Sequence, residues 1–178
     1  MLGLKRGTVI LTKHHGEWAA AFEEEKSNLE KLVGDVAVDI QHFGSTAIPG
    51  LSAKPIIDIL MAVRSLRDVG KIRAALERAG YEYRANGSDD TQVLFAKGPE
   101  VKRTHYLHIT AFDSLGWRNP LAFRDYLRAH PEEAKRYEEL KQKLAARHSN
   151  DRAKYTAGKK DYFEEIFSRA REDRKSVV

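Results

Sequence analysis

The chain has 178 residues, of which 42% are hydrophobic and 32% are charged, so it is long enough for a domain with a core and too apolar for a disordered chain. It contains no cysteine, which excludes disulfides, thiolate metal sites and cysteine nucleophiles and leaves His, Asp and Glu as the expected metal ligands. No apolar run approaches the roughly 20 residues that span a bilayer, and residues 1–7 lack a signal-peptide core, which predicts a cytoplasmic protein without a membrane partner.

The net charge of +5 is unevenly distributed along the chain. Residues 117–178 carry 16 Lys and Arg against 11 Asp and Glu, whereas residues 1–116 carry 15 of each. Acidic and basic residues alternate in the last third, which is typical of solvated helices and argues against nucleic acid as the partner. The same helices could instead lend positive groups to a site that receives a phosphate.

Hydrophobic periodicity predicts the elements of the first half. Residues 8–11 are expected to form a short strand or an extended arm. Apolar residues at intervals of three, four and seven predict a helix over 17–33, and alternation predicts a half-covered strand over 36–43. The run Ile56 to Val63 is apolar on both faces, as a central sheet strand covered on both sides requires. With a helix following over 66–79, the chain is expected to begin in a βαβ-like way.

The second half is predicted to complete the sheet and then to become helical. Two strands, over 81–84 and 92–97, flank the polar turn 86–90, which is a hairpin signal, and a further strand is expected over 104–112. Helices are expected over 120–129, 131–149 and 151–173, the first two with proline in the first turn. The prediction is one domain over 1–178 of the α/β (α+β) class, with a core over 1–116 and a helical part over 117–178.

Asp58 is the one charge in the strand predicted over residues 56–63. An ionised carboxylate costs several kcal/mol to desolvate unless it is paired, hydrogen-bonded or bound to a cation. The pair Gly44-Ser45 precedes it by twelve intervening residues. A glycine at such a turn lets the backbone approach a ligand, and the amides of Ser45 and Thr46 would face an anion such as a phosphate. Alternatively, Gly44 serves a tight turn and Asp58 accepts hydrogen bonds from loop amides.

This spacing of Gly-Ser and a strand aspartate resembles the signature of the nucleotidyltransferase superfamily. In that superfamily the Gly-Ser turn holds a nucleotide triphosphate, and strand carboxylates bind two metal ions. From Trp18 to about Phe167 the sequence resembles the GrpB family more closely. The blocks that carry this resemblance are His42–Thr46, Pro49–Leu51, Ala53–Ile59, His105–His108, Phe123–Arg128, Tyr137–Lys141 and Tyr155–Lys159. The resemblance implies a nucleotidyltransferase-like mixed sheet flanked by helices, with a C-terminal helical extension.

The sequence departs from the superfamily pattern at residue 60. The pattern places a second carboxylate two residues after the first, on the same strand face, and this chain has Leu60 there. Paired carboxylates are what allow two metal ions to bridge a nucleotide, so Leu60 counts against standard two-metal chemistry. Three alternatives stay open: a single-metal site for Mg²⁺ or Mn²⁺ that uses Asp58 and a histidine, a metal-free phosphate site, and a binding pocket without chemistry.

Two histidines on the strand predicted over 104–112 are candidates to join Asp58. They are three residues apart, so they point to opposite faces of the sheet. We favour His108 as a catalytic partner of Asp58. We keep His105, at the strand mouth beside Arg103, as a candidate for phosphate binding with that arginine, although a strand histidine is more often structural.

Three further cations are candidates for phosphate binding. Lys54 precedes the Asp58 strand and could reach a phosphate, or could equally be a solvated loop lysine. The GrpB-like blocks contain Arg124 and Lys159, which on that resemblance would turn back over the cleft. Arg124 is four residues before Arg128, and Tyr155 is four residues before Lys159. Pairs at this i,i+4 spacing otherwise reflect local ion pairing or the packing of long side chains.

The expected ligand is a nucleotide or another phosphorylated small molecule. One hypothesis is a divergent nucleotidyltransferase that uses a divalent ion near Asp58. The alternative is a non-catalytic accessory or chaperone-like module, because domains resembling GrpB occur joined to dephospho-CoA kinase. RNA binding by the basic helices is the third hypothesis, and the interspersed acids count against it.

Overall fold

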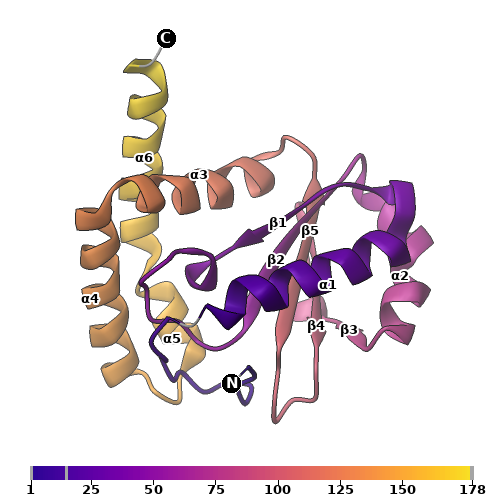
Figure 1. Ribbon diagram of the computed structural model, residues 1–178, viewed down its shortest axis with the longest axis horizontal. Coiled ribbons are helices and arrows are strands. Elements are labelled where there is room, and N and C mark those ends of the chain that lie inside the picture. The colour runs from indigo at the N-terminus through magenta and orange to yellow at the C-terminus, as the bar shows by residue number, and fades with distance from the viewer. Residues whose placement is uncertain (1, 15, 177–178) are drawn as a thin grey trace.

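The computed structural model describes residues 2–14 and 16–176. Figure 1 shows a twisted sheet with α1 running across it and the C-terminal helices gathered at the left and top, where the end of α6 extends away from the rest. Over the described residues, no helix combines the length and the apolar character needed to cross a membrane.

Five strands form one mixed sheet in the order β1-β2-β5-β4-β3. Their bounds are Ala37–Phe43 for β1, Ile57–Val63 for β2, Tyr81–Tyr83 for β3, Gln92–Lys97 for β4 and His105–Ala111 for β5. Only β2 and β5 pair in parallel. The predicted βαβ-like beginning is wrong, because β1 runs antiparallel to β2 and the connection between them contains no α-helix.

Six α-helices surround the sheet over the described residues, as the predicted α/β class with a helical C-terminal part requires. They are α1 Glu17–Val33, α2 Val69–Arg78, α3 Leu115–Ala129, α4 Pro131–Arg147, α5 Arg152–Ala157 and α6 Lys160–Ser176. Single 3₁₀ turns occur at Gly34–Val36, Ser45–Ala47, Leu66–Asp68 and Ala85–Gly87. Residues 8–11 form an extended arm rather than a strand.

Two predictions for the C-terminal helices are wrong. Helix α3 begins at Leu115 because the Ser114 hydroxyl accepts a hydrogen bond from the Trp117 N–H, so Pro120 lies inside the helix rather than at its start. The single helix predicted over 151–173 is interrupted after α5. At Gly158 the backbone lies so close to α4 that a Cβ would be 2.5 Å from Leu144 Cδ2, and glycine is a poor helix former.

The two faces of β2 are covered by different layers. Ile57, Ile59, Met61 and Val63 are buried in one core cluster with residues of α1 and α2. Side chains alternate along a strand, so Asp58, Leu60 and Ala62 point to the opposite face. There Leu60 and Ala62 pack with Trp117 of α3, and this cluster does not include Asp58 at the other end of β2.

Candidate functional site

A cavity of about 990 Å³ lies between the Asp58 face of the sheet and the C-terminal helices. Asp58 of β2 and Tyr106 and His108 of β5 line it from the sheet. Residues of the Gly44–Thr46 turn line it on one side. Side chains of the helical part close it, and these include Tyr137, Arg152, Tyr155 and Lys159.

The turn that follows β1 requires glycine at residue 44. Gly44 has φ +72°, a left-handed conformation that side chains rarely adopt. Phe43 pairs with Asp58 in the β1–β2 register, which brings the turn against that carboxylate. A Cβ on Gly44 would lie 2.6 Å from Asp58 Oδ2, so the backbone and the carboxylate can approach each other only because the side chain is absent.

Two arginines of α3 tether the backbone on either side of this turn. Arg124 Nη1 donates a hydrogen bond to the His42 carbonyl at 2.7 Å, and Arg128 Nη2 donates one to the Ala47 carbonyl at 2.7 Å. His42 Nε2 lies 2.9 Å from Thr46 Oγ1. Burial lowers the pKa of His42 to about 3, and both arginines act in the same direction, so this histidine is neutral and structural at pH 7.

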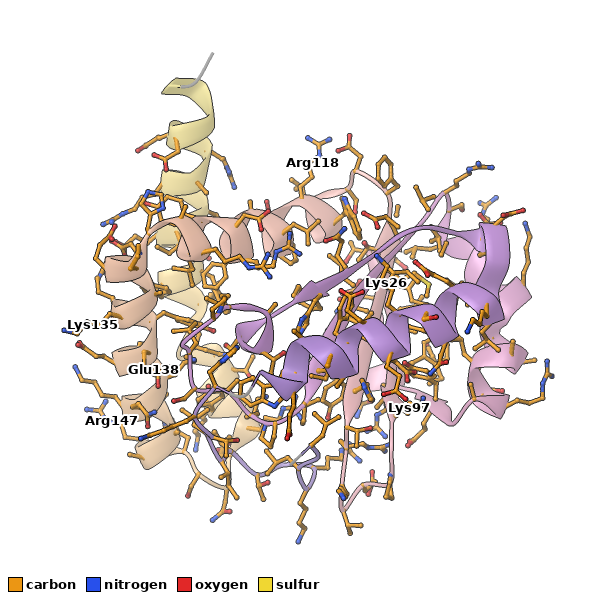
Figure 2. All side chains as sticks on the ribbon, in the orientation of Figure 1. Lys26, Lys97, Arg118, Lys135, Glu138 and Arg147 are labelled. Atoms are coloured by element: carbon orange, nitrogen blue, oxygen red, sulfur yellow. The ribbon has the colours of Figure 1, made fainter. Side chains whose placement is uncertain are left out.

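Helix α4 fastens the loop that leads from the turn to β2. Glu138, labelled in Figure 2 on α4, accepts a hydrogen bond at 2.9 Å from the Ser52 N–H. The buried Lys141 ammonium donates to the Ser52 carbonyl and lies 3.1 Å from Glu138 Oε2. These contacts hold the loop and the helical part together around the cavity.

Three cations line the cavity without a carboxylate partner. Among the described residues, no salt bridge is formed by Lys54, Arg152 or Lys159. The ammonium groups of Lys54 and Lys159 lie 5.7 Å and 4.7 Å from the centre of the Tyr155 ring. Arg152 stacks over Tyr106 at 4.7 Å and donates a hydrogen bond to its hydroxyl at 2.7 Å. The three charges are therefore held mainly by aromatic groups.

Burial destabilises the charged form of both lysines and so lowers their pKa values. Burial lowers the pKa of Lys54 to about 7; Arg152 acts in the same direction and Asp58 opposes it. Burial lowers the pKa of Lys159 to about 8, and Asp58 again opposes the shift. One carboxylate does not offset the neighbouring cations, so a bound anion would stabilise the charged form of both lysines.

His108 is a neutral group beside Asp58. Burial lowers its pKa, with Asp58 opposing and Arg152 reinforcing the shift. Its Nδ1 lies 3.3 Å from Gln92 Oε1, and its ring packs edge-on against Phe43 at 5.1 Å. With the Gln92 oxygen as acceptor, Nδ1 carries the proton and Nε2 is left as a hydrogen-bond acceptor.

The structure brings most of the predicted site residues to this cavity. Those that line it are Gly44, Ser45, Thr46, Lys54, Asp58, Arg103, His108 and Lys159. The Arg103 guanidinium already has protein partners, because it donates a hydrogen bond to the Gly98 carbonyl and forms an ion pair with Glu82.

Two predicted residues lie elsewhere. His105 is buried on the opposite face of the sheet, where Nδ1 lies 3.0 Å from Thr104 Oγ1. Arg124 does not line the cavity, contrary to the prediction, because its guanidinium donates hydrogen bonds to the His42 carbonyl and to Asp125.

Sequence reasoning missed Arg152 and the aromatic rings that hold the cations. The available signal was the spacing of Arg152, Tyr155 and Lys159, which are three and four residues apart as on one face of a helix. Nothing in that spacing shows which face meets the cavity, since the answer depends on the break at Gly158.

The donor set does not fit a two-metal centre. Over the described residues, no group of three or more His, Asp and Glu side chains could hold a metal ion. Asp58 is the one acid among the lining residues, and Leu60, where a second carboxylate would stand, is 1% exposed in an apolar cluster. Three neighbouring cations would also repel a divalent ion.

Comparison with known proteins gives close matches over almost the whole chain. The family model described as GrpB protein matches residues 8–169. The glutamate-rich protein GrpB of Alkalihalophilus pseudofirmus is 44% identical over 172 residues, which cover 94% of this chain and 99% of that protein. The crystal structure of GrpB from Enterococcus faecalis has 36% identity and a TM-score of 0.84, and the match covers 93% of this chain and 99% of that chain.

Other matches are more distant. A dephospho-CoA kinase of Mycolicibacterium paratuberculosis is 28% identical over 191 aligned residues, which cover 94% of this chain and 47% of that protein. The Cid1 poly(U) polymerase bound to MgATP has 15% identity and a TM-score of 0.46, covering 73% of this chain and 45% of that chain. Sequence identity and structural similarity this low transfer no activity to this chain.

Proposed function

The chain belongs to the GrpB family, and from its cavity we propose that it binds a nucleotide or another phosphorylated small molecule through the anionic group of that ligand. The observation that carries the proposal is the convergence of Lys54, Arg152 and Lys159, without carboxylate partners, beside the Gly44–Thr46 turn. Cations in a desolvated site are costly unless they are compensated, and a phosphate would compensate them. The volume of about 990 Å³ suits a small molecule rather than a polymer.

We propose binding rather than nucleotidyl transfer. Transfer with Mg²⁺ or Mn²⁺ needs carboxylates that share two ions, and Asp58 has no second acid among the lining residues. In the binding mode, the ammonium and guanidinium groups provide the positive charge that metal ions would otherwise supply. Asp58 and His108 are then groups that contact the ligand.

The first test is the thermal stability of the protein with a panel of ligands, with and without Mg²⁺. The panel contains nucleoside mono-, di- and triphosphates and also dephospho-CoA, because the chain matches part of a dephospho-CoA kinase. A ligand present at about 100 times its Kd stabilises the folded state by about 2.7 kcal/mol, which corresponds to a rise in Tm of several degrees for a chain of this size.

We expect at least one phosphorylated compound to raise Tm without Mg²⁺, while its unphosphorylated counterpart, such as adenosine, does not. If no phosphorylated compound shifts Tm, the proposal is wrong. A shift that appears only with Mg²⁺ would instead favour the metal-dependent hypothesis.

The affinity for an anion should depend on pH in a defined direction. Since the pKa values of Lys54 and Lys159 are lowered to about 7 and about 8, both side chains are cationic below pH 7 and become neutral as the pH rises through these values. Sulfate keeps its charge over this range. We therefore expect its affinity to fall roughly tenfold or more between about pH 6 and about pH 9.

Isothermal titration calorimetry at constant ionic strength measures this change. The double variant Lys54→Gln, Lys159→Gln should bind sulfate weakly with a flat pH profile. A native profile that is also flat would show that these lysines do not bind the anion.

A further inference from the structure

We propose that Asp58 and His108 select, among phosphorylated ligands, those that carry free hydroxyl groups on the same carbon skeleton as the phosphate, as sugar phosphates and nucleotides do. The inference rests on the proposed function and names the chemical class of its ligand. In this arrangement the cations receive the phosphate, and the two sheet residues accept hydrogen bonds from hydroxyls.

The sheet register places the two acceptors next to each other. Strands β2 and β5 are parallel neighbours in which Asp58 is opposite Tyr106 and Leu60 is opposite His108. Side chains two residues apart share a face, so Asp58 and His108 are diagonal neighbours on the face that the cavity covers. Both line the cavity.

The Asp58 carboxylate is available to a ligand. Among the described residues, it takes part in no hydrogen bond and no salt bridge, although it lies against the Gly44 backbone. The loop amides therefore do not satisfy it, which removes the structural role that the sequence left open. Its side chain is half-buried, so its acceptor capacity faces the cavity in a partly desolvated place.

His108 provides a second acceptor. Its Nδ1 is directed at Gln92 Oε1, so Nε2 has an unshared electron pair, and the ring is held in place against Phe43. An ionised carboxylate and a neutral imidazole nitrogen both require donors, and a phosphate has none when it is fully ionised.

The kind of donor follows from the charges around the two acceptors. An ammonium group on the ligand would be repelled by Lys54, Arg152 and Lys159, whereas a neutral hydroxyl would not. A ligand that presents only a phosphate would leave Asp58 without a donor and would also be repelled by it. A hydroxylated phosphate ester is the class that satisfies both parts of the cavity.

The test compares two phosphate monoesters by isothermal titration calorimetry, D-ribose 5-phosphate and ethyl phosphate. The native protein should prefer ribose 5-phosphate. The substitution Asp58→Asn should weaken ribose 5-phosphate about tenfold, because its hydroxyl then donates to a neutral acceptor instead of a charged one, which makes a weaker hydrogen bond. The same substitution should strengthen ethyl phosphate severalfold, because a repelling charge is removed.

Asp35→Asn is the matched control, since Asp35 is exposed and lies in the Gly34–Val36 turn, outside the cavity lining. It should leave both affinities unchanged. His108→Leu is the second variant and should weaken ribose 5-phosphate while leaving ethyl phosphate within about twofold. Circular dichroism establishes that each variant is folded.

If Asp58→Asn strengthens both esters, Asp58 only repels anions, and the inference fails while the proposed function stands. If Asp58→Asn weakens both esters equally, or if the native protein binds them equally well, the hydroxyl selection is likewise contradicted. If neither ester nor any nucleotide binds the native protein, the proposed function itself has failed.

Discussion

The substitution Gly44→Ala is expected to abolish measurable binding of phosphorylated ligands and to lower the free energy of unfolding by about 2 kcal/mol. Residue 44 has φ +72°, which strains any residue other than glycine. In addition, the new Cβ would lie 2.6 Å from Asp58 Oδ2, so the carboxylate and the turn must move apart. Such a shift displaces Ser45 and Thr46, which line the cavity.

Gly50→Ala is the control that separates strain from contact. Gly50 also has positive φ, at +82°, but an added Cβ would meet nothing within 4 Å. It should therefore cost a similar backbone strain and leave ligand binding intact. Urea denaturation and calorimetry of both variants provide the comparison, and equal loss of binding in the two would show that the contact between Gly44 and Asp58 does not matter.

The substitution Lys159→Met is expected to move stability and binding in opposite directions. Affinity for an anion should fall roughly 10- to 100-fold, because one charge-assisted hydrogen bond is removed. Stability should rise, because burial lowers the pKa of Lys159 to about 8 and a methionine of similar length has no charge to desolvate. Since this lysine's pKa is lowered in the folded state, the gain should be largest below pH 8, where the native lysine is charged, and should shrink at higher pH.

Lys160→Met provides the neighbouring control. Lys160 is exposed and pairs with Glu164 at 3.7 Å, so its replacement should change neither anion affinity nor stability by much. Thermal unfolding at several pH values and sulfate titration measure both properties. If Lys159→Met instead lowers the stability at pH 7, then Lys159 stabilises the folded protein, and the prediction that its buried charge is destabilising is wrong.

Most of the elements follow from local pattern. The helix over Glu17–Val33 and the strand over Gln92–Lys97 have the predicted bounds, while β2 is one residue shorter than predicted at its start and β5 is one residue shorter at each end. These segments bury an apolar stripe or an alternating face, so their periodicity alone indicates their form. The predicted helix bounds are wrong where a cap or a tertiary contact sets the end of the helix, as the Ser114 cap does for α3 and the contact of Gly158 with Leu144 does after α5.

The contacts of Lys97, one of the residues labelled in Figure 2, likewise depend on the tertiary structure. Lys97 of β4 reaches across to α1, where its ammonium binds Glu25 at 2.7 Å and 2.8 Å. Glu25 and Lys97 are 72 positions apart, so no local sequence pattern indicates that these two opposite charges form an ion pair.

The strand that carries Asp58, the glycine turn before it and the absence of a second carboxylate at residue 60 could be read from the sequence, because each depends on residue type and spacing along one segment. Which cations line the cavity beside Asp58 follows from the tertiary structure alone. The parallel pairing of β2 with β5 brings His108 to the cavity and turns His105 away. The packing of α3 places Arg124 against the His42 carbonyl, and α5 places Arg152 in the cavity lining. Both placements depend on contacts between residues far apart in the chain.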